Sequence, residues 1–326
     1  MVMKGQPKSR TRVLVTGGAG RLGMRVCRVF LDDGFDVRVL DLSTGRSRKR
    51  VRRLGERAEV MWGDITQPDS VRQALEGVDA VVHLAGLLPP VTDDQPERAF
   101  GVNVGGTRVL VDLIKEKGGR IPLVFTSSIA VFGATPDATE PVSVERNGPN
   151  PQEVYGETKC RCEELIKEAG IDYVILRMSA AFDLDLGAVK LMFRLPLTNR
   201  FEFCHPDDAI LAIVNAVKYF EAARGNTLLI AGGLGQRMTY ADVIGGALGV
   251  LGLPLPPARK FDQTPYCVDW YDTASSQELL HYQRKTYADF RQDMVRDFSR
   301  QFTPLFVPLM RYFVGPLFGR IIVRLL

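Results

Sequence analysis

A short apolar strand that runs directly into regularly spaced glycines restricts the fold of this chain more than any other feature. Residues 13–15 are followed by Gly17, Gly20 and Gly23, and an amphipathic helical pattern then continues to Phe30. Glycine permits the tight turn and lets the backbone approach a pyrophosphate, to which the helix N-terminus offers free N–H groups. The spacing therefore predicts a dinucleotide-binding turn.

Strand and helix patterns alternate through the first half of the chain. Strands are predicted at residues 37–41, near 60, and at 80–84, 123–125 and 173–176, and helices at 69–76, 96–117 and 152–169. Such alternation predicts right-handed βαβ units, and hence an α/β fold with a Rossmann-type doubly wound parallel sheet. A smaller C-terminal substrate-binding lobe is expected at the carboxyl ends of the strands, where such sheets bind ligands.

The expected domains follow from where this alternation weakens. The dinucleotide-binding domain comprises residues 1–178, joined by 206–232, which contain a clear helix and a late strand. Residues 179–205 and 233–300 form the substrate-binding lobe. A hydrophobic and basic tail, 301–326, completes the chain.

The tail has two alternative roles. Its three prolines and Arg311 argue against a membrane-spanning helix, because a central arginine costs on the order of 2.5–3.5 kcal/mol on insertion scales. Apolar residues with spaced arginines can lie in a membrane interface. The alternative is docking on the protein's own core or on a second subunit. A cytoplasmic protein, either free or peripheral to the membrane, is expected.

Composition argues against several classes of function. The net charge of +4 is modest and concentrated in a basic run at residues 46–53, which is typical of a solvated face, so no nucleic-acid partner is expected. The five cysteines and three histidines lack disulfide or metal-ligand spacing. No metal is therefore expected.

Asp41 ends the second predicted strand. A carboxylate at this position accepts hydrogen bonds from the adenosine ribose diol and repels a 2′-phosphate. The basic run that starts at Arg46 could instead neutralise a 2′-phosphate. The sequence thus favours NAD, with NADP as the alternative.

Further motifs, in order along the chain, resemble those of the extended short-chain dehydrogenase/reductase family, which includes NAD-dependent epimerases and dehydratases. The similar segments are TGGxGxxG at residues 16–23, GD(I/L) at 63–65, HLAG at 83–86, NVxGT at 103–107, SSxxVYG at 127–133 and YGxSK at 155–159. The resemblance covers about residues 11–290. It implies a homodimer and a small-molecule substrate.

The resemblance also implies a catalytic triad of Ser128, Tyr155 and Lys159. Tyr155 is expected to be the acid/base, Lys159 to hold the nicotinamide ribose and lower the Tyr155 pKa, and Ser128 to orient the substrate oxygen. The physical chemistry agrees, because a tyrosine with a pKa of about 10 is a poor base at neutral pH. A neighbouring ammonium group favours the phenolate.

The family's ligand contacts carry over onto a larger set of positions. The expected cofactor-binding residues are Gly17, Gly20, Arg21, Leu22, Gly23, Asp41, Asp64, Ile65, Leu84, Ala85, Gly86, Asn103, Tyr155 and Lys159. The expected substrate-binding residues are Leu87, Leu88, Ser128 and Ala180.

Departures from the family pattern bear on the substrate. Ala180 stands where sugar-nucleotide enzymes carry an asparagine, and Leu87 and Leu88 stand where polar sugar contacts are expected. Apolar walls suit a small or lipophilic molecule. We therefore predict an NAD(P)-dependent oxidoreductase acting on a secondary alcohol or ketone. The alternatives are a nucleotide-sugar epimerase or dehydratase and, second, a non-catalytic NAD(P)-binding regulator.

Overall fold

The computed structural model describes residues 10–135, 138–179, 191–250 and 252–301. The chain divides into two compact units. The described residues of the first unit come from Met1–Val131, Glu153–Arg177 and Ile210–Leu228. Those of the second unit come from Phe132–Gln152, Met178–Ala209 and Leu229–Leu326.

A seven-stranded sheet with the order β3-β2-β1-β4-β5-β6-β8 organises the fold. Its strands are β1 Arg12–Thr16, β2 Asp36–Asp41, β3 Ala58–Trp62, β4 Ala80–His83, β5 Leu123–Ser128, β6 Tyr173–Met178 and β8 Thr227–Ile230. The neighbours from β3 to β5 pair in parallel. Because the strand order reverses between β1 and β4, their carboxyl ends form the switch point at which such sheets bind dinucleotides. The predicted doubly wound sheet is confirmed.

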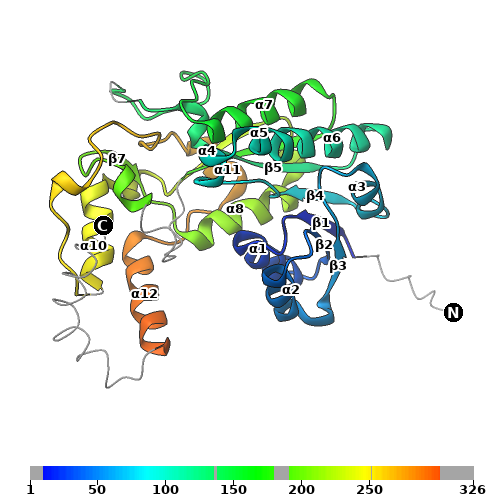
Figure 1. Cartoon of the computed structure of the whole chain (residues 1–326), viewed down its shortest axis with the longest axis horizontal. Coiled ribbons are helices and arrows are strands. Elements are labelled where there is room, and N and C mark those ends of the chain that lie inside the picture. The colour runs from blue at the N-terminus through cyan, green and yellow to red at the C-terminus, as the bar shows by residue number, and fades with distance from the viewer. Residues whose placement is uncertain (1–9, 136–137, 180–190, 251, 302–326) are drawn as a thin grey trace. The chain divides into compact units, whose positions relative to one another are not determined.

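Helices cover both faces of this sheet (Figure 1). Helices α1 (Arg21–Asp32) and α2 (Gly45–Val51) lie on one face, and α6 (Gly106–Glu116) and α7 (Val154–Glu168) lie on the other. Helix α3 (Pro68–Ala74) packs beside α6. The core under α3, α6 and α7 includes Leu14, Val81, Leu110, Ile114, Phe125, Ile166 and Ile175. Burial of this apolar surface, more than helix propensity, holds the helices in place.

The helix predicted over residues 96–117 is interrupted. It consists of α5 (Pro96–Ala99), the π-helical segment η2 (Phe100–Gly105) and α6. A π turn adds a residue to the helical repeat and is frequent at functional sites. Here it contains Asn103, whose side chain bonds to the loop after β4.

The remaining elements are short, belong mainly to the second unit, or, like α8, run from the second unit into the first. They are η1 Arg52–Arg57, α4 Val91–Asp94, η3 Ile129–Phe132, η5 Leu191–Arg194, β7 Arg200–Glu202, α8 Pro206–Lys218, α9 Phe220–Ala223, η6 Leu234–Gln236, β9 Arg237–Thr239, α10 Tyr240–Val250, η7 Ala258–Lys260, α11 Ala274–Leu280 and α12 Tyr287–Gln301.

A buried carboxylate organises the second unit, in which β7 and β9 pair antiparallel. Glu202 accepts hydrogen bonds from the backbone N–H groups of Gly233 (2.8 Å) and Tyr271 (2.9 Å), and it pairs with Arg237. These partners compensate the cost of burying the charge.

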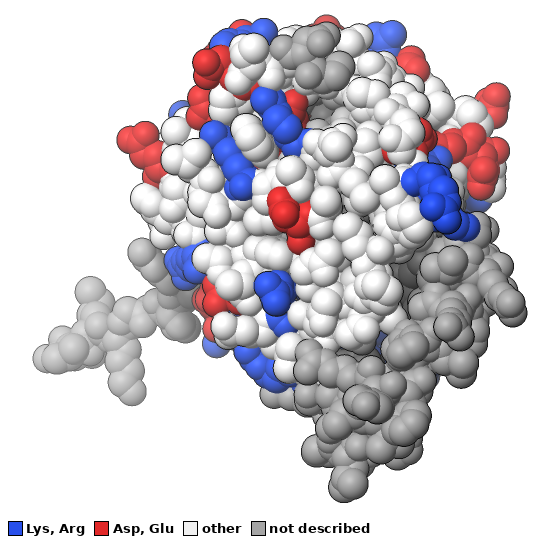
Figure 2. All heavy atoms as spheres, turned by 90° about the vertical axis from the view of Figure 1, so that its left-hand side faces the viewer, with Lys and Arg blue, Asp and Glu red and all other residues white. Residues whose placement is uncertain are grey.

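Basic and acidic side chains are scattered among uncharged residues on the face of the molecule shown in Figure 2. No large patch of a single sign forms among the residues described there, so this face carries no signature of a polyanion-binding surface. Within the described ranges, every helix is too short or too polar to cross a membrane. The tail 302–326 and the predicted substrate residue Ala180 lie outside the described residues.

Candidate active site

The turn between β1 and α1 leaves no room for a side chain at Gly17 or at Gly23. Gly17 has a φ of +70°, and a Cβ atom on it would lie 2.8 Å from the Ala85 backbone nitrogen. A Cβ on Gly23 would meet the Gly17 carbonyl oxygen and lie 2.6 Å from the Gly18 Cα. No side chain caps the N-terminus of α1 at Gly20, so the first N–H groups of the helix can bind an anion.

Asp41, at the end of β2, is anchored to the same turn. Its Oδ2 accepts a hydrogen bond from the Ala19 N–H (2.9 Å) and its Oδ1 one from the Leu42 N–H (2.7 Å). Burial raises the pKa of Asp41, and these N–H groups oppose that shift. Arg50 of the basic run reaches the turn as well, since its Nη1 lies 3.4 Å from the Ala19 carbonyl oxygen.

Asn103 ties three elements together. Its Oδ1 accepts the Leu87 N–H (2.6 Å), and its Nδ2 donates to the Leu87 carbonyl oxygen (3.1 Å) and to Thr158 Oγ1 (3.0 Å). Both hydrogen bonds donated by the Asn103 amide therefore go to other residues of the protein. Through them, Asn103 holds the loop between β4 and α4 against α7. This loop presents Leu88 with 59% of its surface exposed.

Lys159 is buried beside Tyr155, one helical turn away on α7. Only 6% of Lys159 is exposed, and its Nζ donates a hydrogen bond of 2.7 Å to the carbonyl oxygen of Thr126 in β5. The same Nζ lies 5.7 Å from the centroid of the Tyr155 ring. Burial lowers the pKa of Lys159, while Cys162 and Glu163 oppose the shift.

The two serines at the end of β5 differ in their partners. Ser127 is buried and donates its hydroxyl proton to Glu163 Oε1 at 2.6 Å. Ser128 Oγ accepts a hydrogen bond from the Ala130 N–H (3.1 Å), which leaves its own proton for another acceptor. Successive side chains of a strand point to opposite faces, so the hydroxyl groups of Ser127 and Ser128 lie in different surroundings.

His83 is a neutral side chain that links β4 to β1 and α6. Its Nδ1 lies 2.7 Å from Thr16 Oγ1 and its Nε2 lies 3.0 Å from Thr107 Oγ1. Because Thr107 donates its proton to the Asn103 carbonyl oxygen (2.6 Å), the Thr107 oxygen accepts from Nε2–H. Burial, with a contribution from the Lys159 charge, lowers the pKa of His83 to about 3.

Two predicted cofactor-binding residues, Asp64 and Ile65, follow β3. Asp64 Oδ1 accepts hydrogen bonds of 2.9 Å from both the N–H and the hydroxyl group of Thr66. The Ile65 side chain belongs to the core and packs where a Cβ on Gly106 would lie. Only the backbone atoms of Ile65 are therefore available to contact a ligand.

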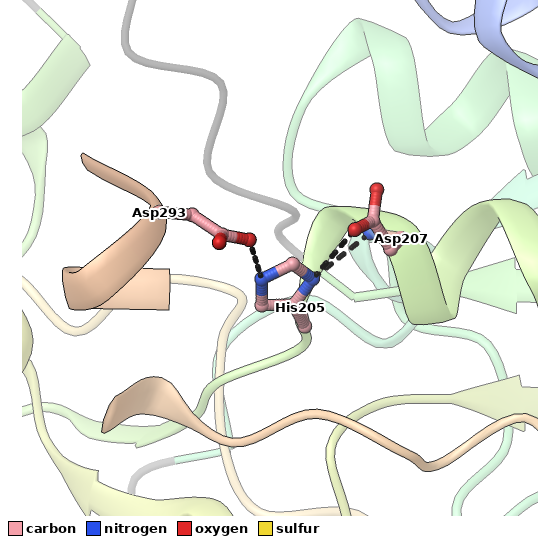
Figure 3. A group of neighbouring side chains, drawn as sticks. All are labelled: His205, Asp207 and Asp293. Atoms are coloured by element: carbon pink, nitrogen blue, oxygen red, sulfur yellow. Dashed lines mark hydrogen bonds and ion pairs between the residues drawn. The ribbon is translucent and has the colours of Figure 1, made fainter. Parts of the chain in front are cut away.

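A cluster in the second unit has the composition of a metal site (Figure 3). His205 Nε2 lies 3.4 Å from Asp293 Oδ2, and its Nδ1 accepts the Asp207 N–H at 3.1 Å. The ammonium of Lys285 lies 2.6 Å from Asp207 Oδ2 and 3.2 Å from Asp293 Oδ2, and Arg296 Nη2 lies 2.7 Å from Asp293 Oδ1, so two cations of the protein already pair with the two carboxylates. The cluster joins the N-terminus of α8 to α12.

Two residues that hold α7 in place were not among the site residues predicted from the sequence. Glu163 and Thr158 both lie on α7 beside the predicted Tyr155–Lys159 pair. Glu163 follows Lys159 by one helical turn, and this spacing alone was a signal that both side chains share a helix face.

Known families and proteins share this sequence pattern. The profile of the family described as "NAD dependent epimerase/dehydratase family" matches residues 13–182, which is more than half of the chain. The 3 beta-hydroxysteroid dehydrogenase/Delta 5-->4-isomerase of Mycobacterium tuberculosis is 33% identical over 171 residues, covering 49% of this chain and 44% of that protein. The UDP-glucose 4-epimerase of Lactobacillus helveticus is 34% identical over 174 residues, covering 51% and 50%. The chain thus spans about half the length of these relatives.

Among solved structures, the UDP-glucose-4-epimerase of Stenotrophomonas maltophila with bound NAD and formylated UDP-arabinopyranose superimposes with a TM-score of 0.74. The match covers 90% of this chain and 100% of that one at 22% identity. At this identity the likeness establishes the shared fold alone.

Replacing Gly23 by alanine should damage the glycine turn. The added Cβ meets backbone rather than a movable side chain, so we expect a loss of roughly 1–3 kcal/mol in the free energy of unfolding and at least tenfold weaker NAD binding. Denaturant unfolding and NAD titration measure both. Gly245→Ala in α10, where nothing lies within 4 Å of the added Cβ, is the control and should gain about 0.5–1 kcal/mol. Unchanged NAD affinity in Gly23→Ala would contradict the prediction that this turn binds NAD.

The neutral state of His83 predicts a specific loss of stability in acid. Its pKa falls from 6.5 to about 3 on folding, so below pH 6.5 the unfolded chain binds a proton that the folded protein does not. We expect the free energy of unfolding to fall by about 1.4 kcal/mol per pH unit from this group as the pH drops toward 3.

The matched variants are His83→Gln, which retains a donor and an acceptor without titrating, and His281→Asn, which removes an exposed imidazole. The slope of stability against pH should flatten in His83→Gln and stay as in the wild type in His281→Asn. Equal slopes in all three proteins would show that His83 is not the source.

Proposed function

The chain belongs to the NAD dependent epimerase/dehydratase family, and from this premise we propose that it is an enzyme that moves a hydride between NAD and a secondary alcohol or ketone. Its catalytic residues in this proposal are Ser128, Tyr155 and Lys159. The observation that carries the proposal is the buried Lys159 ammonium, 5.7 Å from the centroid of the Tyr155 ring. A cation held this close stabilises the phenolate form that a base requires.

The residues of the first unit fit NAD. The glycine turn keeps side chains away from the path of a pyrophosphate, and α1 turns its free N-terminus toward that turn. The Asp41 carboxylate, anchored to Ala19, suits the ribose diol. When bound, NAD supplies the hydride acceptor or donor.

The proton path is built from the chain's own side chains. In the oxidation direction, the Tyr155 phenolate takes the hydroxyl proton of the substrate, and in reduction the phenol returns it. Ser128 donates a hydrogen bond to the same substrate oxygen, while its own oxygen accepts the Ala130 N–H. Lys159 keeps a positive charge beside the phenolate, held in place by the Thr126 carbonyl oxygen.

We favour a small or lipophilic substrate. The loop after β4 is fixed by Asn103 and carries Leu87 and the exposed Leu88, which offer apolar contacts and no charge. The name of the Mycobacterium tuberculosis relative, a hydroxysteroid dehydrogenase, supports this choice.

An epimerase is the second candidate. The Lactobacillus helveticus relative is a UDP-glucose 4-epimerase, and an epimerase of this kind returns the hydride to the same substrate. Incubation of the purified protein with NAD and either a 3β-hydroxysteroid or UDP-glucose separates the two. Accumulation of NADH with the steroid supports net oxidation. Conversion of UDP-glucose without NADH, by protein that retains its NAD, would instead establish the epimerase.

Tyr155→Phe should abolish proton transfer while leaving the fold intact. Loss of a positioned acid/base typically costs 10²–10⁴-fold, so we expect kcat to fall by at least about a hundredfold with NAD binding unchanged. Tyr219→Phe, which changes an exposed tyrosine on the same unit, is the matched control and should keep wild-type turnover. Equal turnover in Tyr155→Phe and the wild type would refute the catalytic assignment and favour a non-catalytic NAD-binding protein.

Asp41→Asn should change the preference between NAD and NADP. Removal of the carboxylate charge ends its repulsion of a 2′-phosphate next to Arg50, so we expect the ratio of NADP to NAD affinity to rise about tenfold or more. Titration with each cofactor measures this ratio. Asp36→Asn, at the opposite end of β2, controls for the loss of one negative charge. A ratio that moves equally in both variants would remove Asp41 from the ribose site.

A further inference from the structure

Helix α7 holds two opposite charges that are buried one turn apart. Lys159 is 6% exposed and Glu163 is 3% exposed. Lys159 bonds to the carbonyl oxygen of Thr126, and Glu163 accepts the hydroxyl proton of Ser127. The helix therefore contacts two consecutive residues of β5, and the next residue of that strand is Ser128.

Glu163 is itself held by a third element. Arg177 of β6 donates to both of its oxygens, from Nε to Oε1 at 2.9 Å and from Nη2 to Oε2 at 2.8 Å. Such a two-point contact fixes the carboxylate in orientation as well as distance. Although burial pushes the pKa of Glu163 upward, the hydrogen bonds and charge of Arg177 and the Ser127 hydroxyl bring it below its ordinary value.

We propose that Glu163, held by Arg177 and bonded to Ser127, is a positioning residue that fixes the register of α7 on β5 and thereby sets the distance from Ser128 to Tyr155. The inference rests on the proposed function, because it assigns a role to residues through that triad. Tyr155, Lys159 and Glu163 follow one another at four-residue spacing, so they form one stripe on the face of α7 toward the sheet. The contacts of Glu163 thus add a second polar anchor to the sheet, one turn from the anchor at Lys159.

The charge pair adds a constraint to the apolar packing of α7. The core already holds the helix against the sheet, and a buried ion that loses its partners is strongly penalised in addition. Displacement of α7 along β5 would separate Glu163 from Ser127 and Arg177 at once. Small displacements matter in catalysis, since a misplacement of about 1 Å can cost roughly a hundredfold in rate.

The ionisation of Tyr155 gives a readout that needs no substrate. Ultraviolet difference titration of the full chain with saturating NAD, taken against Tyr155→Phe, reports the pH at which this phenol ionises. Among the described residues, groups that lie close to Lys159 include Cys162 and Glu163 on α7, Phe125 and Thr126 on β5, and His83 on β4.

Ser127→Ala removes one anchor without removing a charge. We expect the phenol to ionise about half a pH unit or more above the wild type, because the ammonium is no longer held at its distance. Turnover on whichever of UDP-glucose or a 3β-hydroxysteroid the wild type converts should fall about tenfold in kcat, with the KM for NAD unchanged. Ser127→Thr, which keeps the hydroxyl group, should restore both values.

Ser276→Ala is the matched control for loss of a buried serine. Its hydroxyl donates to the Leu229 carbonyl oxygen in the second unit and is as buried as that of Ser127. We expect wild-type ionisation of Tyr155 in this variant, even if it loses the same unfolding free energy as Ser127→Ala.

The outcomes separate the two proposals. A Tyr155 titration in Ser127→Ala that coincides with the wild type and with Ser276→Ala would overturn the positioning role and leave the catalytic triad standing. A Tyr155→Phe protein with full turnover would overturn the triad itself. Arg177→Lys keeps the charge but not the two-point contact, so the Tyr155 titration should shift in the same direction as in Ser127→Ala. If the Tyr155 titration does not shift in Arg177→Lys, Arg177 has no part in anchoring the helix, and Ser127 is the anchor.

Discussion

Two buried charges on one helix, Lys159 and Glu163, are the constraint on which the proposed register of α7 on the sheet depends, in addition to the apolar core that holds the helix there. Removing an ion from water costs several kcal/mol even after relaxation, so each must keep its partners for the helix to stay where it is. Those partners lie on β5 and β6, and they hold α7 at a fixed height on the sheet. Thr158, which directly precedes Lys159, accepts a hydrogen bond from Asn103, whose side chain also fixes the loop after β4.

Local rules were sufficient to predict the sheet and the glycine turn. A Cβ added to Gly17 or Gly23 would meet backbone atoms of the turn itself or of the loop directly after β4. Asp41 follows from the length of a βα unit. The π turn at Asn103 was not predictable in this way, because the hydrogen bonds that accompany it go to Leu87 in another loop. A tertiary contact there overrides the helical period.

Charged residues were the hardest part of the site to predict. Glu163 stood at the correct helical spacing, but its significance comes from Arg177, which reaches it from a different strand. The same is true of His205 and Asp207 in the second unit, whose sequence block gives no sign that Lys285, far along the chain, supplies the compensating cation. Spacing indicates which side chains share a face, and only the folded structure indicates which charges neutralise one another.

The proton path proposed through Ser128, Tyr155 and Lys159 would serve net oxidation and epimerisation equally, so in this proposal selectivity has to come from surfaces outside the triad. Leu88 contributes to one such surface, because Asn103 fixes the loop from which it projects and 59% of it is exposed. Fully burying a leucine side chain is worth about 1.5–3 kcal/mol, so covering this remaining area would contribute on the order of 1 kcal/mol, or several-fold in affinity. An apolar substrate gains that contribution, whereas a nucleotide diphosphate placed there would have its charged groups desolvated against an apolar side chain. In the proposed function, the loop would thus add a preference for apolar substrates without changing the chemistry of the triad.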